Sequence, residues 1–111
     1  MTPSSSILDA GICRCLRAVL DPEIGLNIVD LGLVYLARRS PNTIEVRLTL
    51  TSRACPLAEM VLEDVRERIA STYPDVARVN IKLVWAPVWT PDLITDRGYE
   101  QLGRARKREL T

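Results

Sequence analysis

The chain has 111 residues, of which 47% are hydrophobic and 26% charged, and its 15 basic and 14 acidic side chains leave a net charge of +1. This composition is typical of one soluble globular domain over residues 1–111, and the small net charge gives no bulk attraction to nucleic acid or a membrane. The apolar runs are too short to span a bilayer, no signal-peptide core is present, and the absence of histidine excludes Cys–His and Ser–His–Asp catalysis and the common His-containing zinc sites.

A first helix is predicted over residues 7–20, with its loop and N-cap at residues 4–6. Its apolar stripe is Leu8, Ile12, Cys15, Leu16 and Val19. Cys13 lies at the edge of this stripe, and residues two apart on a helix point to nearly opposite sides, so Cys15 is expected in the core and a metal-binding pair is not expected. Three cysteines without a framework spacing indicate reduced thiols and a cytoplasmic protein.

Residues 21–32, DPEIGLNIVDLG, are predicted to form an ordered acidic loop. Pro22 ends the first helix, because proline restricts the residue before it to extended conformations. Since aliphatic residues alternate with Asp21, Glu23 and Asp30, we expect the loop to lie against the body of the domain with its carboxylates held in place, as in functional loops. The alternative is a connector with solvated acidic side chains.

Two strands are predicted at residues 33–39 and 43–51, joined by a turn into a hairpin. The second of these strands alternates apolar with polar residues, the apolar ones including Ile44, Val46 and Leu48. A second helix at residues 56–71 and a third strand at residues 76–85 follow. The buried face of this helix is predicted to be Ala58, Val61, Leu62, Val65 and Ile69. Because a strand–helix–strand connection is a right-handed parallel crossover, the fold class is α/β (α+β). We expect a small mixed three-stranded sheet with helices on one face, in the order α-β-β-α-β, plus a C-terminal extension.

The C-terminal extension begins with a rigid aromatic segment at residues 85–92. A short helix is predicted within residues 93–102, with Thr95 or Asp96 as its cap. The last stretch, Arg-Ala-Arg-Lys-Arg at residues 104–108, is strongly basic. A solvated tail is the preferred interpretation, and a nucleic-acid patch is the alternative.

The junction between the second strand and the second helix contains the candidate reactive group. Pro56 suits the first helical position, because the amide that proline lacks would be unsatisfied there, and this places Cys55 at the N-cap. The helix dipole would favour a thiolate and lower the pKa of Cys55. Ligands usually bind at this end of the strands in open α/β sheets. The alternative is an inert cysteine in a tight turn.

Three segments, DPEIGLNIVDLGLVY, TSRACP and WAPVWTPDLITDRG, occur in this order. Together they resemble the metal–sulfur cluster assembly factor family, of the SufT and PaaD kind, over about residues 8–102. The resemblance implies a small α/β domain that acts in iron–sulfur cluster maturation as an assembly or accessory factor rather than an enzyme. In this family a reactive cysteine binds clusters or helps transfer them to client proteins.

The resemblance also implies site residues and partners. The corresponding positions in this sequence are Asp21, Glu23, Asp30, Thr51, Cys55 and Pro56. Cys55 would be the soft metal ligand. One cysteine cannot supply the usual four ligands, so we expect a transient cluster that bridges a homodimer or is shared with a carrier, scaffold or client apoprotein. Val34 and Leu36, on the outward face of the sheet, are expected to form an apolar patch for the dimer.

Two alternatives stay open. The WxPxWT segment resembles PaaD, which supports the phenylacetate oxygenase complex in aromatic degradation. PaaD continues into a cysteine-rich tail that is missing here, so a SufT-like protein is preferred. The second alternative is an enzyme in which Cys55 is the nucleophile and Asp21 or Glu23 accepts the proton.

Overall fold

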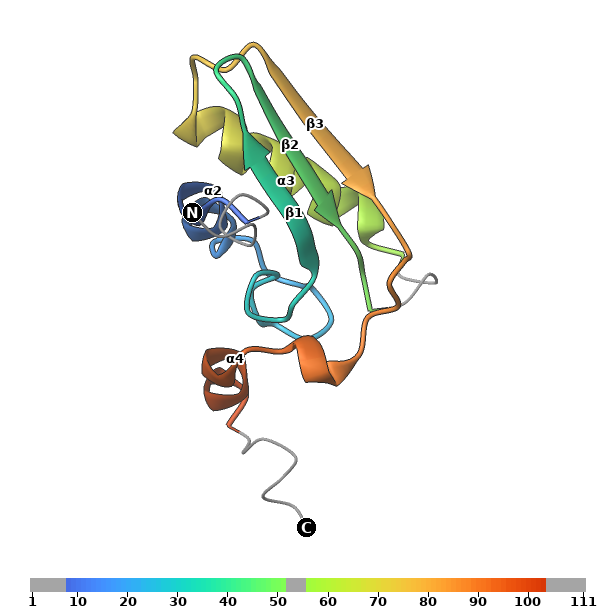
Figure 1. The fold of residues 1–111 in the computed structure, drawn as a ribbon. Helices are drawn as coiled ribbons and strands as arrows, with labels where there is room; N and C mark the ends of the chain where they lie inside the picture. The colour runs from blue at the N-terminus through green and yellow to red at the C-terminus, as the bar shows by residue number, and fades with distance from the viewer. Residues whose placement is uncertain (1–7, 52–55, 104–111) are drawn as a thin grey trace.

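A mixed three-stranded sheet forms the centre of the fold in the computed structural model, which describes residues 8–51 and 56–103. The strands, in spatial order, are β1 (Val34–Arg39), β2 (Thr43–Leu48) and β3 (Arg78–Leu83). β1 pairs with β2 in antiparallel orientation, and β2 pairs with β3 in parallel. Helix α3 (Ala58–Thr72) connects β2 to β3 and lies behind the sheet in Figure 1. The predicted fold class, hairpin and parallel crossover are confirmed.

One hydrophobic core joins the sheet to α3 and to helix α2 (Ala10–Leu16). α3 contributes Val61, Val65 and Ile69, as its 3.6-residue periodicity predicts. The side chains with no exposed surface at all include Ile12, Leu16, Val19, Ile28, Leu31, Leu33, Ile44, Val46, Leu48, Val65 and Ile69. Since burying one such side chain is worth about 1.5–3 kcal/mol, this shared core holds the helices and the loops between them in place.

The first helix begins later than predicted, at Ala10, and Asp9 is its N-cap. The Asp9 carboxylate accepts the Ile12 backbone N–H at 2.9 Å. Leu8 lies beside β1 in an isolated parallel bridge to Ala37, and the Asp9 N–H donates to the Ala37 carbonyl at 2.8 Å. This pairing holds the chain before Asp9 in an extended conformation and covers part of the outer edge of β1.

The first helix also ends earlier than predicted, at Leu16. The chain then turns, and Leu20 pairs with Asn27 in an antiparallel bridge. The Ile28 N–H donates to the Val19 carbonyl at 3.0 Å, which extends this pairing. Helical spacing continues through Val19, but these backbone hydrogen bonds stabilise the extended form instead.

The burial of the two cysteines of α2 differs from that expected. Cys13 is buried, with 8% of its surface exposed, whereas Cys15 is half-buried. The Cys15 thiol lies 3.2 Å from the Thr72 hydroxyl on α3. Burial is the largest influence on the pKa of Cys13 and raises it. The expected core position of Cys15 is met only in part, since it is partly buried against the core, whereas Cys13, expected at the edge of the stripe, belongs to the core itself.

The second and third strands are shorter than predicted. β2 ends at Leu48 rather than residue 51, and β3 spans Arg78–Leu83 rather than residues 76–85. Beyond β2, the Thr49 N–H donates to the Leu33 carbonyl at 2.8 Å, while the Val84 N–H donates to the Leu48 carbonyl at 2.8 Å. These two bonds continue the backbone pairing for one residue beyond the strands, on the β1 side and on the β3 side of β2.

The expected apolar patch at Val34 and Leu36 is wrong, because these side chains are only 7% and 9% exposed. The pairing register shifts between them, as in a β-bulge, and such a bulge redirects side chains. Val34 therefore joins the core. Instead, ion pairs cover the outward face of this hairpin, where Glu45 lies 3.0 Å from Arg47 and 4.0 Å from Arg38.

The outer edge of β3 is the second edge of the sheet. It carries the exposed side chains of Arg78, Asn80 and Lys82. From α3, the Arg66 guanidinium donates to the Val79 carbonyl at 3.3 Å. This edge is therefore lined by polar and cationic side chains.

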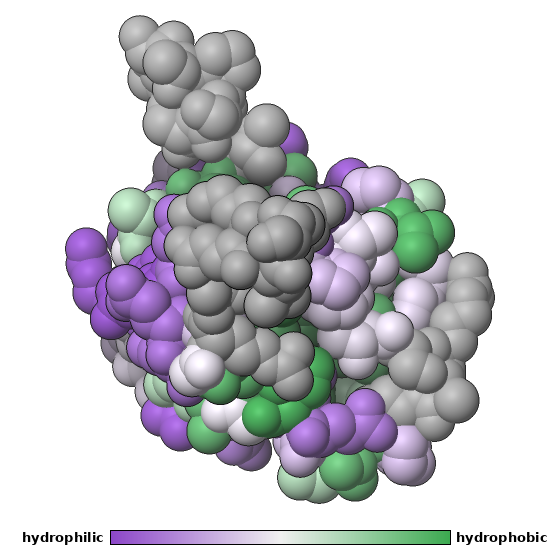
Figure 2. Space-filling model, turned by 90° about the horizontal axis from the view of Figure 1, so that it is seen from below, coloured by the Kyte–Doolittle hydropathy of each residue, from purple (hydrophilic) through white to green (hydrophobic). Residues whose placement is uncertain are grey.

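The C-terminal extension contains a 3₁₀ turn, η1 (Pro91–Leu93), and helix α4 (Asp96–Gln101). The predicted cap is confirmed, since the Thr95 hydroxyl accepts the Gly98 N–H at 3.0 Å. The Trp89 indole donates to the Leu31 carbonyl at 2.7 Å. α4 lies at the bottom of Figure 1, and the view from below in Figure 2 shows hydrophobic surface beside hydrophilic residues. No helix within the described ranges is both long and apolar enough to cross a membrane.

Candidate functional site

The acidic loop, residues 21–32, is ordered by its own side chains. Asp21 is 1% exposed, and its Oδ1 accepts the backbone N–H groups of Glu23 at 2.8 Å and Ile24 at 3.0 Å. The backbone also closes this turn, because the Gly25 N–H donates to the Asp21 carbonyl at 2.8 Å. These bonds are those of an Asx turn. The Asp21 carboxylate therefore shapes the loop.

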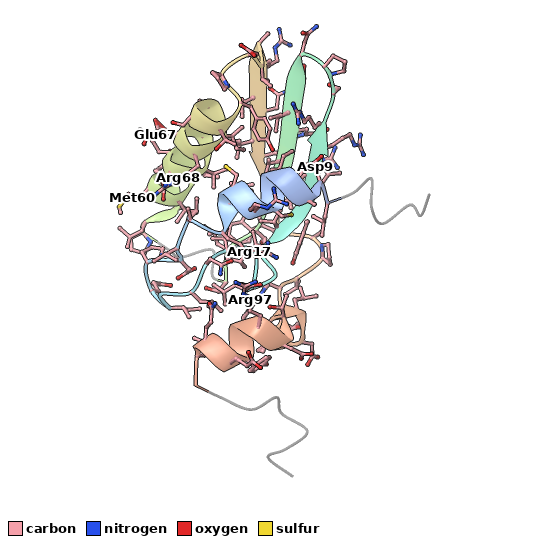
Figure 3. The ribbon with its side chains drawn as sticks, turned by 90° about the vertical axis from the view of Figure 1, so that its left-hand side faces the viewer. Asp9, Arg17, Met60, Glu67, Arg68 and Arg97 are labelled. Atoms are coloured by element: carbon pink, nitrogen blue, oxygen red, sulfur yellow. The ribbon has the colours of Figure 1, made fainter. Side chains whose placement is uncertain are left out.

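Asp30 joins the acidic loop to α4. Its carboxylate, 2% exposed, accepts the Asn27 amide at 2.9 Å and the Thr95 hydroxyl at 3.0 Å. The Thr95 N–H also donates to the Asp30 carbonyl at 2.9 Å. The guanidinium groups of Arg17 and Arg97 lie 3.8 and 3.9 Å from the carboxylate oxygens, and Figure 3 shows both arginines at the junction of α2, the loop and α4.

Glu23 differs from the other two carboxylates of the loop. It is exposed, and its side chain has no hydrogen bond or ion pair to any residue in the described part of the chain. Of the three predicted acidic residues, Glu23 is therefore the one whose carboxylate is free to contact an external group. Asp21 and Asp30 hold the backbone that presents it.

The strand-to-helix junction begins differently from the prediction. The N-cap of α3 is Leu57, whose carbonyl accepts the Val61 N–H at 3.2 Å, and no side chain caps the helix. Pro56 lies in the preceding turn, so its predicted place as the first helical residue and the predicted N-cap position of Cys55 are wrong. Proline is as compatible with such a turn as with a helix start, which explains the error. Thr51 is half-buried and Pro56 exposed, while Cys55 lies outside the described residues.

The acidic loop and the first half of α3 lie side by side. An open groove of about 310 Å³ lies between them, and Leu20 and Pro22 line it together with Met60 and Val61. The structure therefore brings the loop and the start of α3 together. Within residues 8–51 and 56–103, no three or more Cys, Asp or Glu side chains are grouped closely enough to hold a metal ion.

The sequence patterns did not predict three side-chain contacts that hold the acidic loop in place. They are made by Asn27, by Trp89 and by Thr95, which donates to Asp30. Asn27 and Asp30 are three residues apart in a loop, which is a spacing at which Asn side chains often bond the backbone. That signal was available. The partnerships of Trp89 and Thr95 span 58 and 65 residues and leave no local pattern.

Comparison with known proteins gives a consistent result. A family model described as "Iron-sulfur cluster assembly protein" matches residues 9–82, which include the acidic loop and the strand-to-helix junction. A "Fe-S protein maturation auxiliary factor" of Porphyromonas gingivalis is 39% identical over 93 residues, covering 83% of this chain and 88% of that protein. The "Fe-S protein maturation auxiliary factor SufT" of Staphylococcus aureus is 36% identical over 78 residues, covering 69% of this chain and 88% of that protein.

A larger relative and a solved structure extend the comparison. An "Iron-sulfur cluster carrier protein" of Synechocystis is 37% identical over 72 residues, which are 65% of this chain but 20% of that protein. The crystal structure of a "Domain of Unknown Function DUF59" from Bacillus anthracis superposes with a TM-score of 0.79 at 33% identity, covering 84% of this chain and 89% of that one.

Proposed function

The chain belongs to the iron–sulfur cluster assembly protein family, and from this premise we propose that it is a SufT-like maturation factor that binds clusters transiently and helps transfer them to client proteins. The observation that carries the proposal is the extent of the match, because residues 9–82 include both predicted site segments. The relatives named as maturation factors are also covered over 88% of their length. As part of this proposal, the protein is a cytoplasmic homodimer and not an enzyme.

The cluster is the cargo of this reaction, and Cys55 is its proposed ligand. A thiolate is a good ligand for cluster iron, but a cluster usually takes four. The remaining ligands would come from a second chain, a carrier, a scaffold or the client. This sharing would leave the cluster free to move on to a protein that provides a complete ligand set.

The acidic loop has a proposed role in presenting and retaining the cargo. Glu23 is exposed beside Pro22, which lines the same groove as Met60 on α3. Its carboxylate would act on bound iron, while Asp21 and Asp30 fix the loop that carries it. Thr51 and Pro56 flank the segment that contains Cys55, and they would position it. The oxygenase-accessory and cysteine-nucleophile alternatives remain predictions.

Anaerobic reconstitution tests the proposal on one set of variants. The wild-type chain should gain the visible absorbance of a cluster together with bound iron and sulfide, and should activate an apo iron–sulfur protein. Cys55→Ala should lose all three signals. Glu23→Gln should retain the fold, as judged by its thermal melting, but lose iron faster, because the change is nearly isosteric and removes only the charge.

Glu100→Gln is the matched control, because it removes one exposed carboxylate from α4, away from the proposed site. It should behave like the wild-type chain. Full cluster retention by Cys55→Ala would overturn the ligand assignment. If Cys55→Ala lost the cluster while Glu23→Gln retained iron like the wild-type chain, Cys55 would stand as the ligand. The acidic loop would then have only a structural role.

A further inference from the structure

An apolar groove with exposed side chains lies between α3 and the chain that follows α2. Leu20 is 54% exposed and Met60 is 61% exposed, and both line the groove. Figure 3 shows Met60 projecting outward from α3. The other lining residues include Glu63, Asp64 and Glu67. The groove therefore combines an apolar surface with an acidic wall.

The acidic wall is largely without cationic partners. Asp64 pairs with Arg68 at 3.5 Å, but Glu63 and Glu67 have no ion pair within the described residues. Glu59, one turn earlier on α3 and beyond the lining of the groove, has none there either. These three glutamates recur every fourth residue, so they lie along one side of α3. Like charges at this spacing destabilise a helix, and a cationic partner would relieve the repulsion.

We propose that this groove binds the basic tail, residues 104–110, of a second copy of this chain, so that two copies form a symmetric dimer with exchanged tails. The tail reads Arg-Ala-Arg-Lys-Arg-Glu-Leu and has four cationic residues in its first five positions. Long arginine stems can cover apolar side chains such as Leu20 and Met60 while the guanidinium groups reach carboxylates. Leu110 adds an apolar side chain. This inference specifies a surface for the homodimer that the proposed function includes, and it is tested on the cluster-free chain, whereas cluster binding is tested separately by reconstitution.

The spacing of the charges supports this pairing. In an extended segment, alternate residues are about 6.6 Å apart, which is the separation expected for Arg104, Arg106 and Arg108. On a helix, residues four apart are about 6.0 Å apart along the axis, as for the three glutamates. Over three pairs the accumulated difference is only about 1.2 Å, which flexible arginine side chains can absorb.

The position of α4 favours the tail of a second copy over the chain's own tail. α4 packs closely on the acidic loop, because a Cβ added at Gly98 would lie 2.9 Å from the Asp30 carbonyl oxygen. In both Figure 1 and Figure 3 the loop lies between α4 and α3. Arg104 directly follows Gly103, and one residue spans at most about 3.6 Å, so the chain's own first arginine stays beside α4 and cannot join Arg106 and Arg108 along the acidic wall. A second copy has no such restriction.

Sedimentation equilibrium of the cluster-free chain tests the proposal. We expect a dimer at low ionic strength that weakens as salt is added, because exposed charge pairs are screened. Truncation after Gly103 and the double variant Glu63→Gln/Glu67→Gln should each weaken dimerisation at least tenfold. The matched control, Asp75→Asn/Glu100→Gln, removes two exposed carboxylates elsewhere and should dimerise like the wild-type chain.

A charge exchange provides the sharper test. The groove variant Glu63→Arg/Glu67→Arg and the tail variant Arg106→Glu/Arg108→Glu should each be monomeric alone. Mixed together they should form a heterodimer, since each tail then meets a groove of opposite charge. Thermal melting verifies that each variant is folded. Equally tight dimerisation of the truncated chain, a wild-type chain that stays monomeric, or no heterodimer on mixing would overturn the proposal.

Discussion

At the scale of single residues, the three carboxylates of the acidic loop differ in their burial and in their hydrogen bonds. Asp21 and Asp30 are buried and accept hydrogen bonds from the loop itself, from Asn27 and from Thr95. Glu23 is exposed. A buried carboxylate must be satisfied within the fold, whereas an exposed one can be replaced at little structural cost. Substitution of Asp21 or Asp30 should therefore lower the stability of the fold, whereas substitution of Glu23 should affect the proposed cluster binding and leave stability nearly unchanged.

Asp30→Ala should destabilise the fold by about 2–4 kcal/mol, because it leaves the buried Asn27 amide and the Thr95 hydroxyl without their acceptor. Urea denaturation measures this change. Arg97→Ala is the control, since Arg97 is 65% exposed and lies 3.9 Å from the same carboxylate. It should cost less than about 1 kcal/mol. Equal effects in the two variants would show that the ion pairs, rather than the hydrogen bonds, stabilise the junction.

Two glycines with the same backbone conformation should respond differently to alanine. Gly25 has φ +83° and open space where a Cβ would be, so Gly25→Ala should cost about 1 kcal/mol for the left-handed backbone alone. Gly32 has φ +80°, and its Cβ would lie 2.6 Å from the Leu93 Cβ. Gly32→Ala should therefore cost about 1–3 kcal/mol more. The difference in chemical denaturation midpoints checks this, and similar midpoints would contradict it.

The three thiols should alkylate at different rates. Cys13 should be slowest, because it is buried and burial raises the pKa of its thiol, which keeps it protonated. Cys15 is half-buried against α3 and should be intermediate. We expect Cys55 to react fastest. Mass-spectrometric labelling over time under native conditions measures the order, and faster labelling of Cys13 than of Cys55 would be inconsistent with the proposed site.

At the scale of elements, α4 depends on its docking. It has six residues, which is too few for an isolated helix to persist in water. The Thr95 hydroxyl both caps α4 through Gly98 and donates to Asp30. One side chain therefore couples formation of the helix to its attachment to the acidic loop.

Thr95→Ala should loosen α4 selectively. We expect a loss of about 1–2 kcal/mol, because the cap and the bond to Asp30 disappear together. Amide hydrogen exchange at Tyr99 and Leu102, which donate within this helix, should accelerate while the amides of α3 remain protected. Thr90→Ala is the matched control, since Thr90 precedes η1 without a side-chain capping bond. Unchanged exchange in Thr95→Ala would show that packing alone holds α4.

The elements that sequence patterns predicted well are those with a clear hydrophobic period. The buried face of α3 and the alternation of Ile44, Val46 and Leu48 in β2 were predicted correctly. The ends of α2 were not, because Leu8 and Leu20 pair with distant or opposing backbone rather than continuing the helix. Likewise, the bulge that turns Val34 into the core depends on pairing with β2. Periodicity does not report such tertiary backbone bonds.

At the scale of the whole molecule, the sequence indicated which segments contain the candidate site but not what each side chain does there. The element order was compatible with an acidic loop beside the start of α3, but it did not fix their distance, which the structure shows as a shared groove. That Asp30 is committed to Thr95, 65 residues away, did not. Long-range side-chain pairs decide which carboxylate remains available, and they follow only from the assembled fold. The family resemblance predicted the site residues, while the hydrogen bonds distinguish the buried carboxylates from the exposed one.

The two edges of the sheet also determine how the protein behaves when concentrated. An unpaired strand edge is a template for pairing with another chain, and this is a common route to aggregation. Residues 8–9 occupy part of the β1 edge, whereas β3 presents Arg78 and Lys82 and has a backbone carbonyl already bonded by Arg66. Two β3 edges that both carry positive charge repel each other, so edge-to-edge pairing of the sheets of two molecules is disfavoured. High salt would screen this repulsion, so storage buffers of low ionic strength should better preserve the dispersed protein.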